Sequence, residues 1–162
     1  MKKPFTDEDA AALVECTAKL AKTTATDEKG PQPVAIACAI PSLDAMTVPT
    51  ATRLMDGTKA LSMTGAINKV WTVLAYKADT KKHADRIKNG SWSEADMILQ
   101  QSALPQFCPW DGGIVVMDKN GGLLCALSCD GRTSEGDRRL AVLAAHRMGY
   151  CTNFDERGEP LS

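Results

Sequence analysis

Residues 108–146 read CPWDGGIVVMDKNGGLLCALSCDGRTSEGDRRLAVLAAH, and this stretch decides the fold class. Two apolar runs, 114–117 and 123–128, flank a polar segment that contains Asn120-Gly121. Asn-Gly between apolar runs is the strongest short-range signal for a β-hairpin, because tight hairpin turns need residues with positive φ. The stretch therefore predicts two antiparallel strands joined by a tight turn.

The predicted hairpin is followed by a glycine turn and the start of a helix. Asp130-Gly131 ends the second apolar run, and Ser134 precedes Asp137 by three residues. A serine followed three residues later by an acid is typical of a capping box, in which the two side chains satisfy free backbone N–H groups at the helix start. We therefore expect Asp137 to be the capping partner of Ser134 in a helix over the apolar-periodic segment that follows.

The residues before this stretch predict the rest of a layered domain. Thr6 begins a helix that fades over residues 23–26, and Pro49 marks the weaker of two further strands as an edge strand or a bulge. The other expected elements are strands 34–40 and 46–53, a long helix 61–78 and a short helix 92–101. Short turns between neighbouring strands indicate an α+β fold with a mainly antiparallel sheet flanked by helices.

Strand 34–40 carries bulky and small side chains on opposite faces. Val34, Ile36, Cys38 and Ile40 alternate with three alanines, and successive side chains of a strand point to opposite faces of the sheet. We expect the small face to allow a helix to approach closely.

Length, charge and composition narrow the class of protein. The chain has 162 residues and a net charge of −1, and we expect a single domain, 1–162, with a core over about residues 6–150 and a polar, mobile tail 151–162. No apolar run reaches the ~20 residues of a membrane span, and nothing in the charge favours nucleic acid or an anionic membrane. The lysine-rich segment 79–90 is expected to be solvated, with His83 exposed.

The cysteines and the N-terminus indicate a cytoplasmic protein. The first residues turn acidic after two lysines and lack an apolar core, so we expect no secretory signal. Six cysteines in such a chain predict free thiols rather than disulfides. Cys108, Cys125 and Cys129 could bind a soft metal, but they show no CxxC spacing and no histidine nearby, so we expect core thiols and no metal site.

Three local patterns occur in a fixed order along the chain. They are RLMDG at 53–57 with AINKVWT at 66–72, Gly112-Gly113 at the start of the hairpin, and CDG at 129–131 before Asp137. Their order and spacing resemble the GlcG/HbpS-like heme-binding family over about residues 6–150. The same domain forms the C-terminal part of PduO-type corrinoid adenosyltransferases.

This resemblance implies both an assembly and a ligand. It implies a small antiparallel sheet flanked by helices, assembled as a homo-oligomer, a tetramer or an octamer. It also implies a small planar or carboxylate ligand, with heme, another tetrapyrrole or a corrinoid as the first choices, and a role accessory to small-acid or diol catabolism. In some members of the family, a histidine in the first helix is an iron ligand. The first helix here has none, and Cys16 is the substitute to consider.

Glycine turns supply most of the predicted ligand-binding groups. Gly112 and Gly113 can let a planar ligand approach the backbone, or they can simply shape the start of the strand. The turn after Gly131 precedes a helix, where free N–H groups bind carboxylates, or it is a plain strand-to-helix turn. The predicted binding residues are Gly112, Gly113, Gly131, Arg132, Thr133, Ser134, Lys69 and Thr72.

An enzyme acting on a small carboxylate metabolite is the alternative. Its candidate catalytic residues are Asp137 as a general base, Lys69 as an amine or carboxylate partner, and Arg53 as an anion contact. Each also has a structural explanation: a helix cap for Asp137, an ammonium that reaches solvent for Lys69, and a turn ion pair with Asp56 for Arg53. A third hypothesis is an accessory subunit of a cobalamin-dependent enzyme or a microcompartment. The enzyme hypothesis requires at least two of the three catalytic candidates to share a pocket.

Overall fold

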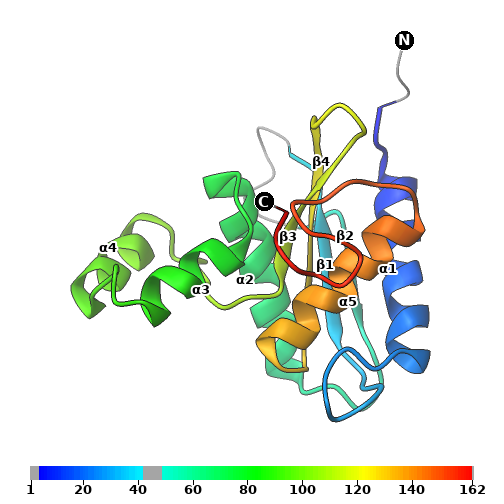
Figure 1. Cartoon of the computed structure of the whole chain (residues 1–162), viewed down its shortest axis with the longest axis horizontal. Coiled ribbons are helices and arrows are strands. Elements are labelled where there is room, and N and C mark those ends of the chain that lie inside the picture. The colour runs from blue at the N-terminus through cyan, green and yellow to red at the C-terminus, as the bar shows by residue number, and fades with distance from the viewer. Residues whose placement is uncertain (1–3, 42–48, 162) are drawn as a thin grey trace.

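The computed structural model describes residues 4–41 and 49–161, which form a four-stranded sheet with helices on both faces (Figure 1). The strands pair in the order β2-β1-β4-β3, and every pair is antiparallel. The predicted α+β fold is therefore confirmed. In chain order the elements are α1 (Asp7–Thr23), β1 (Ala35–Ala39), β2 (Ala51–Leu54), α2 (Ala60–Tyr76), α3 (Thr80–Lys88), α4 (Glu94–Ala103), β3 (Gly113–Met117), β4 (Leu123–Asp130) and α5 (Ser134–Arg147).

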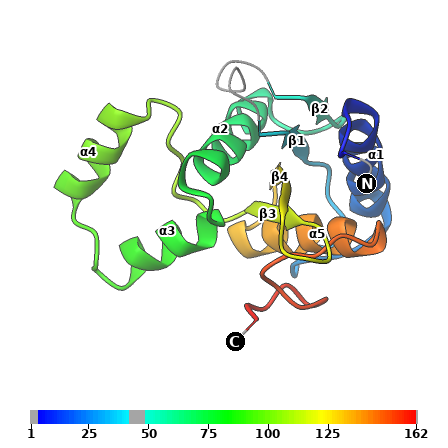
Figure 2. The ribbon, with the colours of Figure 1, turned by 90° about the horizontal axis from the view of Figure 1, so that it is seen from above.

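Each face of the sheet packs against its own helices (Figure 2). On one face, Ala35, Ala37 and Ala39 of β1 share a core with Val70 of α2. On the other face, Ile36 shares a larger core with side chains of α1 and α5. The small side chains of β1 therefore let α2 lie close to the sheet, as predicted.

The strands β3 and β4 form the predicted hairpin. Gly121 in its turn has a φ of +79°, and the Asp118 carboxylate accepts the backbone N–H groups of Asn120 and Gly122. The central pairing of β4 with β1 places the last residue of β4, Asp130, just before the turn that leads into α5.

The edge position predicted for the second strand is confirmed. β2 is described over Ala51–Leu54, begins two residues after Pro49 and lies at the end of the strand order. Residues 46–48 of the predicted strand lie outside the described residues. No helix in the described ranges has both the length and the apolar character needed to cross a membrane.

The segment predicted to be solvated, 79–90, forms α3 and is tied to the sheet. Asp79 accepts a backbone N–H of β3 at 2.7 Å, and the Thr80 hydroxyl accepts the N–H of Gly113 at 2.9 Å. His83, predicted to be exposed, is only 1% exposed. The prediction of an exposed His83 was wrong because α3 is short and mostly polar. Its composition is the same as that of a solvated loop, although a few of its polar side chains are buried.

The C-terminal segment predicted to be a mobile tail packs against the domain. Cys151 and Met117 exchange two backbone hydrogen bonds, at 2.8 and 2.9 Å. Phe154 is only 3% exposed and belongs to the core between the sheet, α1 and α5. The prediction was wrong because this one aromatic side chain anchors an otherwise polar segment.

Candidate functional site

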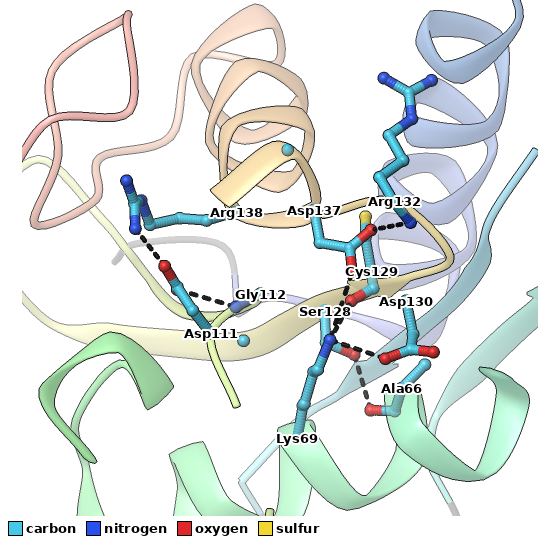
Figure 3. Close-up of polar contacts among 12 residues, drawn as sticks. Ala66, Lys69, Asp111, Gly112, Ser128, Cys129, Asp130, Arg132, Asp137 and Arg138 are labelled. Atoms are coloured by element: carbon cyan, nitrogen blue, oxygen red, sulfur yellow. Dashed lines mark hydrogen bonds and ion pairs between the residues drawn. The ribbon is translucent and has the colours of Figure 1, made fainter. Parts of the chain in front are cut away.

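A buried lysine joins three elements of the fold (Figure 3). Lys69 projects from the middle of α2, Asp130 ends β4, and Asp137 lies in the first turn of α5. Lys69 Nζ lies 2.8 Å from Asp130 Oδ1 and 3.4 Å from Asp137 Oδ2, and it donates to the carbonyl oxygen of Cys129 at 2.9 Å. These contacts occupy the three donors of the ammonium group. We call Lys69, Asp130 and Asp137 the Lys69 cluster.

Burial governs the protonation of the Lys69 cluster. The side chains of Lys69 and Asp137 are each 2% exposed, whereas that of Asp130 is 28% exposed. Burial alone would lower the pKa of Lys69, but Asp137 and Asp130 together raise it above its ordinary value. Burial raises the pKa of Asp137 to about 6, although Lys69 and the N–H of Arg132 oppose the rise. Lys69 is therefore a fixed cation and not an amine nucleophile.

Glycines make room for the Lys69 cluster. A Cβ at Gly112 would lie 2.8 Å from Lys69 Nζ, and Gly112 has a φ of +123°, which side chains disfavour. A Cβ at Gly65 would lie 2.8 Å from Asp130 Oδ1, and one at Gly113 would lie 3.1 Å from the Lys69 Cβ. The space beside Gly112 and Gly113 is thus filled by the chain itself, in the place where we predicted a planar ligand.

The predicted anion-binding turn holds carboxylates from the chain itself. The N–H of Arg132 donates to Asp137 Oδ1 at 3.0 Å, and the N–H of Thr133 donates to Asp27 Oδ2 at 3.1 Å. The Thr133 hydroxyl also donates to Asp27 Oδ2, at 3.2 Å. The free N–H groups at a helix N-terminus favour an acid. At the start of α5 that acid is Asp27, which belongs to the loop after α1.

Thr133, one residue earlier than predicted, caps α5. Thr133 Oγ1 accepts the N–H of Gly136 at 3.1 Å, and Ser134 is the first residue of the helix. Asp137 is therefore not the capping partner of Ser134, and its carboxylate belongs to the Lys69 cluster. The prediction was wrong because Thr133 and Ser134 both carry a hydroxyl that can cap a helix, and the sequence does not show which of the two does so.

Two other predicted binding side chains make contacts within the chain. The guanidinium of Arg132 donates to three backbone carbonyl oxygens in residues 21–32 and so holds the segment after α1. The Thr72 hydroxyl is fully buried and accepts the N–H of Cys108 at 2.8 Å. In this conformation both side chains support the loops around the Lys69 cluster.

A pocket of about 480 Å³ opens beside the Lys69 cluster. It brings Gly57 of the RLMDG pattern next to Gly131 of the CDG pattern, so two distant parts of the sequence meet there. Asp130 forms part of its wall while its carboxylate holds Lys69. The lining residues are Gln32, Pro33, Gly57, Thr58, Lys59, Ser62, Asp130, Gly131 and Arg132.

Arg53 lies outside this arrangement. Its guanidinium pairs with Glu15 of α1, not with Asp56 as predicted, because the β2 edge lies beside α1. It lines a separate pocket of about 350 Å³. The structure therefore brings together Lys69 and Asp137, but not the third catalytic candidate.

A second buried ion pair lies beside the Lys69 cluster, and the sequence analysis missed it. The Arg138 guanidinium contacts the Asp111 carboxylate, and these side chains are 5% and 9% exposed. Arg138 also donates to the carbonyl oxygen of Gly158 at 3.0 Å. The sequence analysis also missed Asp130 as a partner of Lys69, since neither pair has a local spacing that would reveal it.

The cysteines are free thiols, as predicted. Burial raises the pKa of Cys108 and of Cys129, so both remain thiols at neutral pH. Burial also raises the pKa of Cys16, which weakens the case for a thiolate iron ligand on α1. Within residues 4–41 and 49–161, no group of three His, Cys, Asp or Glu side chains is arranged to hold a metal ion.

The sequence of the chain matches a known protein family. The sequence matches the family described as haem degrading protein HbpS-like over residues 5–146. The chain therefore belongs to the HbpS-like family, which confirms the resemblance inferred from its motifs. None of the curated proteins matches the chain.

Several solved structures share this fold at low sequence identity. The crystal structure of a PduOC:heme complex is 20% identical, with a TM-score of 0.71, and the match covers 93% of this chain and 99% of that chain. A double mutant of HbpS from Streptomyces reticuli is 20% identical, with a TM-score of 0.68 and coverage of 92% and 90%. Klebsiella pneumoniae protein ORFY is 18% identical, with a TM-score of 0.69 and coverage of 92% and 94%. These likenesses establish the shared fold.

Proposed function

We propose that this protein binds haem or a closely related tetrapyrrole. The observation that carries the proposal is its membership of the HbpS-like family over residues 5–146. The fold that it shares with a PduOC structure containing heme supports the same ligand class. The proposal concerns binding, with haem as the first ligand to test.

The side chains around His83 are of the kinds that hold a haem. Haem needs a donor atom for its iron and apolar or aromatic walls for its ring. His83 is 1% exposed, and neither of its ring nitrogens has a hydrogen-bond partner among the described residues. Tyr76, Trp92 and Phe107 surround the imidazole. When bound, haem would supply an iron centre that takes up small ligands or exchanges an electron.

The geometry of the Lys69 cluster favours a binding protein over the enzyme hypothesis. Lys69 and Asp137 do meet, but each is 2% exposed and the ammonium donors are already used. Only Asp130 of the cluster contributes to the pocket lining, and Arg53 lies in another pocket. We therefore propose that the Lys69 cluster holds α2, β4 and α5 together beneath the pocket.

We further propose that the chain forms a homo-oligomer through α4. This helix contains no buried residue, and it lies apart from the sheet and its covering helices (Figure 2). A helix of ten residues is too short to be stable alone in water. Ile98 and Leu99 are 58% and 64% exposed, and apolar side chains on such a helix mark an interface. The resemblance makes a tetramer or octamer the expected assembly.

Titration with hemin tests the proposed ligand. We expect a saturable shift of the Soret band with one haem per chain. Iron-free protoporphyrin IX and cobalamin, titrated in parallel, separate haem from the other tetrapyrroles and corrinoids. Absence of saturation with all three compounds would contradict the proposal.

A further inference from the structure

An aromatic cluster surrounds a histidine between α2, α3 and the loops that flank α4. We use this name for Tyr76, His83, Trp92 and Phe107. The Trp92 ring stacks on the imidazole, with centroids 5.3 Å apart and an interplanar angle of 28°. Tyr76 and Phe107 meet the imidazole edge to face, at 4.7 and 5.6 Å. The Arg86 guanidinium lies over the Trp92 ring, 5.1 Å from its centroid.

The polar atoms of the histidine in this cluster have no partner within residues 4–41 and 49–161. His83 is 1% exposed, and both Nδ1 and Nε2 lack a hydrogen-bond partner in the described chain. Burial, reinforced by the charges of Arg86 and Lys82, lowers the pKa of His83 to about 4. The neutral form of an imidazole is the form that binds metals. An unsatisfied buried polar group calls for an explanation, and a metal bond supplies one.

His146 and Cys16 are less suited to iron than His83. His146 Nε2 is engaged with the Thr152 hydroxyl at 3.1 Å. The pocket beside the Lys69 cluster is lined by no histidine, cysteine or methionine. Burial raises the pKa of Cys16, which disfavours its thiolate. Of the two histidines in the sequence, His83 is the one with both ring nitrogens unpartnered.

We propose that His83 is a ligand of the haem iron and that the aromatic cluster is the haem site. This assignment rests on the proposed function. One ring nitrogen would donate its lone pair to the iron, and the other would keep its N–H. Trp92 is the ring that stacks on His83, so it must move to admit a planar ligand. Arg86 and Lys82 on α3 supply cations that can pair with the propionates of haem.

Ligand replacement followed by absorption spectroscopy tests the assignment. The full chain is titrated with hemin as wild type, His83→Leu, His83→Gly and His146→Leu. We expect His83→Leu to change the Soret and visible bands and to weaken hemin binding roughly tenfold or more, since even indirect partners of a metal site cost that much. His146→Leu should match the wild type. Added imidazole should restore the wild-type bands in His83→Gly, which a purely structural role would not produce.

The outcomes separate the two proposals. His83→Leu should fold, because it removes an imidazole whose nitrogens have no partner in the described part of the chain, and circular dichroism of the unloaded protein checks this. If the wild type binds hemin and folded His83→Leu gives the same bands and affinity, the His83 assignment is overturned and haem binding stands. If the wild type does not bind hemin, the proposed function is overturned and the assignment falls with it.

Discussion

Lys69 Nζ lies 2.8 Å from Asp130 Oδ1, and this contact links the interior of the domain to a pocket. The lysine side chain is 2% exposed, whereas the aspartate side chain is 28% exposed and lines the pocket. Asp137, on the buried side, lies 3.4 Å from the same ammonium. One cation thus holds two carboxylates from different elements, and several consequences can be measured.

Replacing the cation of the Lys69 cluster should destabilise the fold. Lys69→Met keeps most of the side-chain length but leaves Asp137 buried without its counter-charge. We expect the free energy of unfolding in urea to fall by about 3–5 kcal/mol. Lys59→Met, an exposed lysine beside the same pocket, should change it by less than about 0.5 kcal/mol. Equal effects of the two substitutions would contradict the role of the cluster.

Gly112 should tolerate a side chain much less well than another glycine with positive φ. Gly112→Ala combines a disfavoured φ of +123° with a Cβ only 2.8 Å from Lys69 Nζ. Gly121→Ala has a φ of +79° and meets no atom within 4 Å. We expect a loss of about 1–2 kcal/mol for Gly121→Ala, from backbone conformation alone, and a clearly larger loss for Gly112→Ala. Thermal unfolding of both variants checks the difference, and the reverse order would contradict the packing described here.

The buried imidazole should make the unloaded protein less stable in acid. The pKa of His83 is about 4 in the folded state and 6.5 ordinarily, so between these values the unfolded chain binds the proton that the folded chain refuses. Stability should therefore be lost as the pH falls from about 6.5 to 4, by about 3 kcal/mol from this group. The difference between His83→Leu and the wild type, from urea unfolding at each pH, isolates this contribution. A difference that does not change with pH would contradict the burial of His83.

Asp137 should act in the opposite direction over much of the same range. Burial raises its pKa to about 6 in the folded state, so the folded chain holds the proton more tightly than the unfolded chain. Its stabilising contribution is present at low pH and is lost as the pH rises through 6. Asp137→Asn should abolish this pH dependence of the free energy of unfolding. Urea unfolding of the variant and the wild type at several pH values measures it. If the same pH dependence persists in the variant, it belongs to another group and the prediction for Asp137 is wrong.

Charges on the apolar surface of α4 should dissociate the oligomer. We expect the combined variant Ile98→Glu and Leu99→Glu to lower the mass measured by light scattering, because both side chains are exposed and apolar in the single chain. Gln101→Glu, an exposed residue of the same helix, adds a charge without removing an apolar group and should leave the mass unchanged. An oligomeric wild type whose mass survives the double substitution would place the interface elsewhere. A monomeric wild type would contradict self-association through α4, and the exposed apolar side chains of the helix would then contact a different partner.

The sequence predicted the fold better than the contacts of the site. The Asn120-Gly121 turn and the alanines of β1 act over a few residues, so spacing alone revealed the hairpin and the close approach of α2. The pairing of Lys69 with Asp130 joins α2 to β4, and it depends on a strand register that no local pattern encodes.

The burial of His83 was also not predictable from local sequence. Its neighbours Lys81 and Lys82 give the segment a polar composition, whereas the packing of three aromatic rings against the imidazole buries His83. The features that sequence reasoning missed are therefore those set by tertiary packing and not by local propensity.

Native mass spectrometry of the full chain with excess hemin tests the central claim most directly, because it counts ligands and subunits together. We predict one haem bound per chain within a homo-oligomer. A protein that keeps its unliganded mass in excess hemin would contradict the account.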